Sequence, residues 1–173
     1  MQAGLFVGVE SPIKVEEVDP FPPGPNDVVV DIAGSGVCHT DVAILSGALP
    51  WSSPSILGHE VTGTVVEVGP EVTRVKVGHR VISSGIPACS NCFYCVRGQS
   101  HLCERTYSWG EVPRARRADG TTVTAFGSLG GFAEMMTVPE ASIVAVRSEL
   151  PAEQPALIGC AVTTGVGAAL NTA

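Results

Sequence analysis

Residues 89–103, CSNCFYCVRGQSHLC, place four cysteines within fifteen residues. The surrounding residues 85–105 also carry Gly, Pro, Ser and Asn and show almost no hydrophobic periodicity, so apolar contacts alone cannot order this segment. Four thiolates in one loop complete the tetrahedral shell of Zn²⁺ and leave no position open for water or substrate. The sequence therefore predicts a structural zinc site with the ligands Cys89, Cys92, Cys95 and Cys103.

Two other uses of these cysteines stay open, because four thiolates also ligate iron–sulfur clusters and paired cysteines form disulfides. The N-terminus has neither a basic segment nor a sustained apolar run, so no export signal is recognisable. We therefore expect a cytoplasmic, reducing location, which disfavours disulfides. His101 lies inside the lobe, but four sulfurs already fill the metal shell, and we expect this histidine to be a solvated surface residue.

The composition of the whole chain is that of a globular domain rather than a disordered segment. Of its 173 residues 45% are apolar and 16% are charged. A net charge of −7 argues against a nucleic-acid partner, because phosphate neutralisation needs clustered positive charge. The longest mostly apolar stretch, residues 156–170, is shorter than the roughly 20 residues that a bilayer crossing needs, so we expect no membrane partner.

Short β-branched runs predict a mainly β domain, with strands at residues 28–32, 61–68 and 132–138 and a further run at 75–81 around a turn at Gly78. The best helical candidate is residues 151–171, where Pro151 stands near the N-terminus and Glu153 in the first turn. Within it, GVGAAL at residues 165–170 superficially suggests a dinucleotide-binding glycine motif. It follows no predicted strand and ends in leucine, so we interpret it as small-residue helix packing.

Two cysteines lie outside the lobe, Cys38 and Cys160, and His59 is the candidate nitrogen donor to join them. Two cysteines and a histidine with a free fourth position form a known type of catalytic zinc site. Spacing alone does not bring three dispersed residues together, however. On spacing alone, Cys160 is better explained as a small buried apolar residue.

The order and spacing of four motifs resemble those of the zinc-dependent medium-chain alcohol dehydrogenases. The motifs are GVCHTD at residues 36–41, GHEVTG at 58–63, the four-cysteine lobe, and IGCAVTTG at 158–165. All six cysteines fall on ligand positions of that family, and the resemblance covers nearly the whole chain. It implies a GroES-like, mainly β domain: a partly open barrel with a few short helices and a zinc-binding lobe.

The resemblance implies two zinc ions per chain. It assigns Cys38, His59 and Cys160 to a catalytic zinc, with Glu60 as a nearby carboxylate that approaches the metal in exchange with water. The implied reaction is hydride transfer between a zinc-bound small alcohol, or the matching aldehyde, and NAD or NADP.

The three residues that follow Cys38, which are His39, Thr40 and Asp41, also match the family's site. Thr40 matches the hydroxyl that accepts the substrate proton, although a helix-capping threonine would look the same. His39 matches a residue that contacts the cofactor pyrophosphate, or it is a solvated loop residue. Asp41 matches a group that orients the metal-binding histidine, here His59.

Three positions depart from the family pattern. Ala43 stands where many members carry the histidine that ends the proton relay, so the terminal acceptor is open between water and the cofactor ribose. Gly85 replaces a frequent aromatic residue and suggests a wider substrate pocket. His79 replaces a common aspartate and has no functional interpretation.

The family's dinucleotide-binding domain follows the helix after Cys160, whereas this chain ends at Ala173. We therefore expect residues 1–155 to be the catalytic domain, with the lobe at 85–105, and residues 156–173 to start the helix that leads to a missing Rossmann domain. We expect the isolated chain to be inactive and the full-length form to be a homo-oligomer.

Other functions remain open on the sequence. The main alternative is a non-catalytic, zinc-stabilised binding module derived from the family. The net charge counts against a third reading, a nucleic-acid-binding zinc ribbon. Within the family, polyol or threonine oxidation and the oxidation of glutathione adducts are not separated, and Arg105 is no clear match for an anion-binding arginine. The residue that distinguishes NAD from NADP lies outside the chain.

Overall fold

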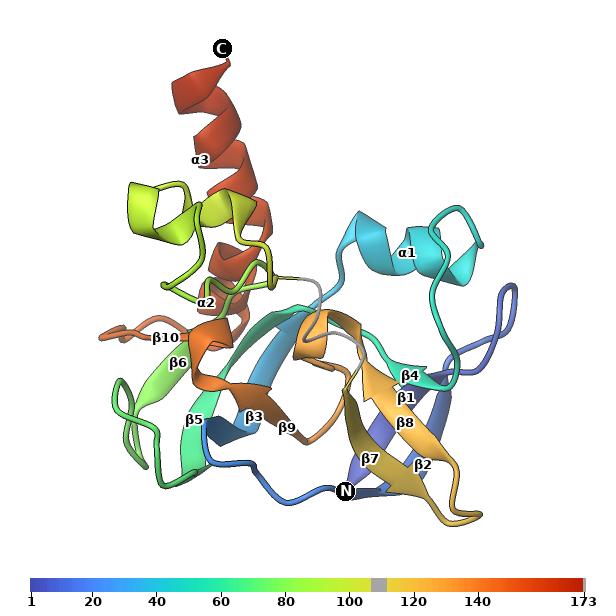
Figure 1. Cartoon of the computed structure of the whole chain (residues 1–173). Helices are drawn as coiled ribbons and strands as arrows, with labels where there is room; N and C mark the ends of the chain where they lie inside the picture. Colours follow the sequence, from blue (N-terminus) through green and yellow to red (C-terminus); the bar gives the residue numbers. More distant parts are fainter. Residues whose placement is uncertain (107–111, 173) are drawn as a thin grey trace.

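Two β-sheets form the body of the protein (Figure 1). The computed structural model describes residues 1–106 and 112–172. Within these ranges, the first sheet closes into a barrel in which β4 pairs in parallel with β8 and the other pairs are antiparallel. In order around the barrel, its strands are β1 (Gln2–Phe6), β2 (Lys14–Pro20), β7 (Pro113–Arg117), β8 (Thr122–Ala125) and β4 (Ser55–Ile56).

The second sheet is open and antiparallel, with β3 near its centre. β3 sends Val28 and Val30, two residues apart, into the core, as the period of a strand requires. Its pairing with β5 is irregular next to Gly63, where a Cβ atom would overlap the Asp31 carbonyl oxygen, so glycine permits the close approach. The order is β10 (Ile143–Ala145), β6 (Arg80–Ser83), β5 (Glu60–Val68), β3 (Asp27–Gly36) and β9 (Met135–Pro139).

The helices of the described residues are short: α1 (His39–Leu45), α2 (Glu153–Ala156) and α3 (Ala161–Asn171). Single 3₁₀ turns connect other elements: η1 (Cys95–Arg97), η2 (Ser100–Leu102), η3 (Phe126–Ser128), η4 (Glu140–Ser142) and η5 (Leu157–Gly159). α3 projects away from both sheets and buries none of its residues (Figure 1). In the described ranges, no helix has both the length and the apolar character needed to cross a membrane.

Three apolar clusters hold these elements together. One fills the open sheet and includes Val28 and Val30, and a second fills the barrel around Leu5. The third joins Phe6 of β1, Ile44 of α1 and Leu57, which is two residues before His59. Because Ile44 and Leu57 are completely buried against each other, the helix that follows Cys38 is fixed beside the segment that carries His59.

The expectation of a mainly β domain is confirmed, and the strands predicted at 28–32 and 61–68 lie inside β3 and β5. The turn expected at Gly78 is confirmed: Gly78 adopts φ +87° and the His79 amide donates to the Lys76 carbonyl, so the strand of the 75–81 run, β6, begins only at Arg80. One boundary was wrong. Residues 132–134 precede β9, since Phe132 bonds across to the barrel through Gly4.

The single helix expected at 151–171 was also wrong, because the structure divides it into α2, η5 and α3. The break is at Cys160, which has φ −135° and ψ −75°. Residues 165–170 lie in α3 and no strand precedes them, as expected, but in the described chain Gly165 and Gly167 pack against nothing. Ala173, the end of the expected segment 156–173, lies outside the described residues.

Two candidate metal centres

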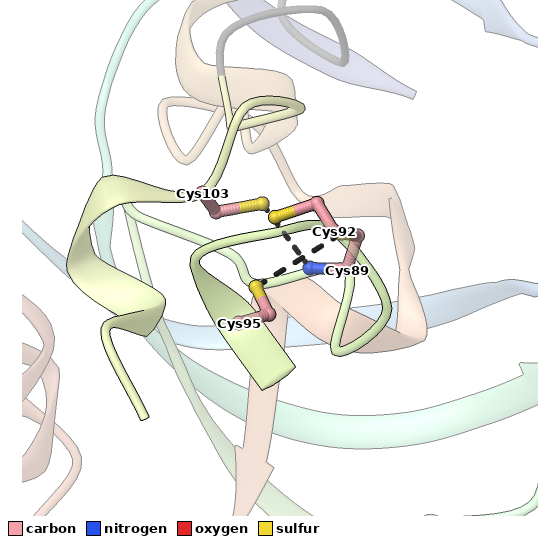
Figure 2. A group of neighbouring side chains, drawn as sticks. All are labelled: Cys89, Cys92, Cys95 and Cys103. Carbon is pink, nitrogen blue, oxygen red and sulfur yellow. Dashed lines mark hydrogen bonds between the residues drawn. The ribbon is translucent and has the colours of Figure 1, made fainter. Parts of the chain in front are cut away.

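The four cysteines of the lobe gather in one loop (Figure 2). Their sulfur atoms all lie within 4.8 Å of one another, and Cys92 and Cys103 are buried. Two Zn–S bonds of about 2.3 Å at the tetrahedral angle place their sulfurs about 3.8 Å apart, so the loop already brings the four sulfurs close to the separations that one ion needs. The donor set and its spacing therefore fit a single zinc ion.

Backbone amides of the lobe favour ionised sulfur at two of the four cysteines. Burial opposes ionisation of Cys103, but N–H groups of Cys89 and Arg105 outweigh it and lower the pKa of this thiol to about 6. The Cys95 amide likewise lowers the pKa of Cys92. Burial, followed by the Cys92 thiol, raises the pKa of Cys95 to about 12. The lobe thus favours thiolate, the form that binds metal, at Cys92 and Cys103 but not at Cys95.

Apolar contacts contribute little to the order of the lobe. Its large apolar side chains, Phe93, Val96 and Leu102, are 48 to 65% exposed. His101 is exposed as well, which agrees with the expectation of a solvated histidine. The convergence of the cysteines is therefore the main feature that can fix this loop.

A second cluster brings together Cys38, His59, Glu60 and Cys160, whose ligand atoms all lie within 4.8 Å of one another. Cys38 precedes α1, His59 and Glu60 stand at the start of β5, and Cys160 occupies the break before α3. The two sulfurs are 3.9 Å apart although 122 positions separate them in the sequence. Cys160 is half-buried at this cluster and is not a core residue.

Asp41 ties the first two of these ligand segments together. It is completely buried, and its carboxylate accepts hydrogen bonds from the amides of Cys38, at 2.9 Å, and Gly58, at 3.1 Å. Burial favours the neutral acid, but His59 and these two amides outweigh it and hold the pKa of Asp41 below its ordinary value. Asp41 is therefore a carboxylate that fixes Cys38 relative to the residue before His59.

The same carboxylate faces His59: its Oδ1 lies 3.6 Å from His59 Nδ1, which has no hydrogen-bond partner in the described chain. Burial acts to lower the pKa of His59, but Asp41 and Cys38 outweigh it and raise the value. With Nδ1 facing Asp41, Nε2 is the ring nitrogen left for a metal. The structure therefore brings Asp41 close to His59, and its orienting role stays a prediction.

The other residues singled out in the sequence lie at different distances from this cluster. Thr40 Oγ1 is 3.6 Å from Cys38 Sγ, and Thr40 lies inside α1 while Cys38 occupies the capping position, so Thr40 is not the helix cap. His39 is exposed at the start of α1 and is not among the clustered ligands. Ala43 is half-buried one turn further along, and a Cβ atom on Gly85 would meet open space.

Two aromatic residues beside the cluster were not selected from the sequence. The Phe126 ring packs edge-on against His59 at 5.3 Å, and Trp51 packs edge-on against Phe126 at 4.8 Å. Both are half-buried, so they form an apolar wall next to the candidate ligands. No pattern in the sequence would have selected them; they only stand out as aromatic residues in a chain where such residues make up 5%.

Comparisons with known proteins agree with this arrangement. Residues 24–148 match the family model of the alcohol dehydrogenase GroES-like domain. An S-(hydroxymethyl)glutathione dehydrogenase of Paracoccus denitrificans is 40% identical over 99% of this chain and 48% of its own length. The chain spans about half the length of the curated relatives it matches.

Two solved structures have the same fold. An alcohol dehydrogenase zinc-binding domain protein from Burkholderia ambifaria superposes with a TM-score of 0.91 and 28% identity, over 99% of this chain and 48% of that one. A cobalt- and zinc-bound thermostable alcohol dehydrogenase from Pyrobaculum aerophilum superposes with a TM-score of 0.80 and 30% identity, over 100% of this chain and 49% of that one.

Proposed function

This chain belongs to the alcohol dehydrogenase GroES-like domain family, and from that premise we propose that it is the catalytic portion of a zinc-dependent alcohol or aldehyde dehydrogenase. The observation that carries the proposal is the second cluster, in which Cys38, His59 and Cys160 converge with Glu60. A module stabilised by zinc alone needs only the four-cysteine lobe. A second, mixed set of donors is what a metal that works on a substrate needs.

The two donor sets suit two zinc ions with different tasks. Cys89, Cys92, Cys95 and Cys103 would hold one ion in a closed shell, and Cys38, His59 and Cys160 would hold the other. At the second site, zinc supplies Lewis-acid polarisation of an alcohol or carbonyl oxygen. Glu60, which is 2% exposed, lies within the same cluster and provides a carboxylate that can exchange with water there.

The chain's own residues would orient the ligands and move the proton. Asp41 holds His59 in the orientation described above and fixes the start of α1. Thr40, half-buried beside Cys38, is placed to accept the proton of the substrate hydroxyl and pass it outward. Because Ala43 offers no acceptor on the next turn, the proton leaves Thr40 to water or to the cofactor ribose.

The cofactor would be NAD or NADP, bound mainly by residues outside this chain. We propose that residues 1–155 form the catalytic domain and that residues 156–173 begin the connection to a dinucleotide-binding domain. Two observations support this. The relatives are about twice as long as this chain, and α3 exposes apolar side chains that another domain could cover: Val162, Val166 and Leu170 are 45 to 79% exposed. His39, exposed at the start of α1, is proposed to contact the pyrophosphate.

The proposed substrate is a small alcohol or aldehyde, and the protein is proposed to work in the cytoplasm as a homo-oligomer. The free state of all six cysteines supports a reducing location, and the exposed apolar side of α3 supports association with another surface. The name of the Paracoccus denitrificans relative makes S-(hydroxymethyl)glutathione one candidate substrate. The apolar wall of Phe126 and Trp51 favours a substrate with an apolar group.

A metal count tests the proposal directly. The purified chain, saturated with zinc and freed of excess metal by gel filtration, should carry two zinc ions, one for each donor cluster. Elemental analysis against protein concentration from amino-acid analysis gives the ratio. A ratio of one, retained when Cys38 is replaced by serine, would instead support the non-catalytic module.

The chain by itself should not oxidise primary alcohols with either cofactor. Hydride transfer needs the nicotinamide held about 3 to 3.5 Å from the reacting carbon, and immobilising a free dinucleotide costs on the order of several kcal/mol. Here α3 follows the 3₁₀ turn η5 rather than a strand, and His39 offers at most one contact. Titration of the zinc-loaded chain with NADH, followed by nicotinamide fluorescence, should show no saturation below about 1 mM. Turnover that Cys38→Ser abolishes would contradict this expectation.

A further inference from the structure

Ser83, the last residue of β6, has its hydroxyl buried beside the segment that carries His59. Its side chain donates a hydrogen bond to the His59 carbonyl at 2.7 Å and accepts one from the Val61 amide at 2.8 Å, and the residue is 1% exposed. The backbone pairing of β5 with β6 ends at Thr62 and Ile82. Beyond that point the Ser83 hydroxyl, in place of the β6 backbone, makes the hydrogen bonds to the main chain at His59 and Val61, the residues before and after Glu60.

Ser83 also contacts the segment that carries Cys160. Gly159 packs so closely on Ser83 that a Cβ atom on the glycine would overlap the Ser83 carbonyl oxygen and lie 3.1 Å from its hydroxyl. This packing coincides with the break between η5 and α3, where the backbone leaves helical geometry at Cys160. One residue therefore touches the main chain at His59 and the main chain next to Cys160.

The position of Ser83 is itself fixed from the opposite edge of β6. Ser83 pairs with Ile143 of β10, and the Ser84 amide donates to the Ser142 carbonyl at 2.8 Å. Figure 1 shows this side of the open sheet, where β6 lies between β5 and the edge strand β10. A residue that is itself fixed from two sides can hold the segments that it contacts at a constant separation.

We propose that Ser83 is a positioning residue for the second metal centre: its hydroxyl fixes His59 and its backbone seats Gly159, and together these contacts set the separation of His59 from Cys160. The inference rests on the proposed function, because it concerns how that centre is built. Within the described residues, the hydrogen bonds of the Ser83 hydroxyl go to the backbone and not to a ligand side chain, so Ser83 acts on the ligands through their main chain. Loss of the hydroxyl leaves the His59 carbonyl and the Val61 amide buried without this partner, so the start of β5 is free to shift.

Cobalt binding measures this role without any assay of activity. In the wild-type chain, visible absorption should show one contribution from the four-cysteine site and another from the site with two sulfurs. In Ser83→Ala, the second contribution should shift in wavelength and need about tenfold more free cobalt to appear, the size of effect seen when partners behind metal ligands are lost. The four-cysteine contribution should stay unchanged and serves as the internal reference.

Thr62→Val is the matched control. Thr62 is also fully buried between β5 and β6, and its hydroxyl donates to the Val81 carbonyl at 2.9 Å, but it bonds to no ligand residue. This variant should lower the melting temperature and leave both cobalt contributions as in the wild type. Equal cobalt behaviour of Ser83→Ala and Thr62→Val would overturn the proposal, because the hydroxyl would then have only a general effect on stability.

Gly159→Ala tests the same link from the Cys160 side while keeping the serine hydroxyl. The added methyl group should push the two segments apart and perturb the two-sulfur contribution alone, and an unperturbed spectrum would overturn the proposal even if Ser83→Ala failed to fold. Failure of the proposed function would look different. In that case the wild-type chain itself would show no two-sulfur contribution, and the premise would fall with it.

Discussion

Replacing Cys95 with serine should remove one zinc ion from the chain and unfold the lobe, the largest loss of stability that we expect from any single substitution. Structural zinc contributes on the order of 10 kcal/mol in small metal-dependent domains. The lobe has little to offset that loss, because its large apolar side chains are about half exposed or more. Three remaining thiols would leave the shell incomplete, and the buried Cys92 and Cys103 would lose the ion that compensates their charge.

Zinc content and thermal unfolding, measured on the same samples, check this expectation. The ratio of zinc to chain should fall from two to one and the melting temperature should drop, while the Cys38, His59 and Cys160 centre keeps its metal. Ser100→Ala, at an exposed position in the same lobe, is the control and should change neither quantity. A Cys95→Ser chain with unaltered stability and zinc content would show that the four cysteines are not a structural site.

His59→Ala should empty the second centre and leave the lobe intact. The imidazole is the one nitrogen donor of the cluster, and alanine leaves Cys38 and Cys160 with only a carboxylate beside them. The substitution also leaves the buried Asp41 carboxylate without the neighbour that its charge faces. Both effects act in the same direction, so we expect metal affinity at this centre to fall by at least 100-fold, more than outer partners contribute.

In the cobalt-loaded chain this loss appears as selective disappearance of the two-sulfur contribution to the visible spectrum, with the four-cysteine contribution retained. His101→Ala is the matched control, since His101 is an exposed histidine within the lobe. A spectrum identical in His59→Ala and wild type would remove His59 from the ligand set, and the dehydrogenase proposal would lose the observation on which it stands.

Local patterns in the sequence predicted what depends on local interactions. The β-branched run at 28–32 alternates between core and surface, and it lies in β3 of the open sheet, between β5 and β9. The four cysteines of the lobe are close in the chain, so their convergence needed no knowledge of the rest of the fold. The turn at Gly78 was likewise predicted from the glycine, and its φ of +87° and the hydrogen bond from the His79 amide to the Lys76 carbonyl bear it out.

Features set by contacts between distant segments could not be predicted in this way. The break at Cys160 coincides with the packing of Gly159 on Ser83, two residues that are 76 positions apart. The alanines around it favoured one continuous helix, and the internal glycines and paired threonines that opposed this prediction did not indicate a break at Cys160. Ser83 itself was an unremarked serine in a turn-rich stretch, since its role depends on where the pairing of β5 with β6 ends. Family resemblance supplied the grouping of Cys38, His59 and Cys160, which spacing alone did not.

The two donor sets differ greatly in how much chain each must close into a loop. In the lobe, the Cys89 amide donates a hydrogen bond to the sulfur of Cys103, 14 positions away. In the second set, Cys38 and Cys160 are 122 positions apart. Loop closure costs entropy that grows with the logarithm of length, a difference of about 2 kcal/mol here. The lobe can therefore gather its donors while the rest of the chain is still unfolded. The second set exists only when the end of β3, the start of β5 and the break before α3 have come together, so an ion bound there reports that these distant segments are in place.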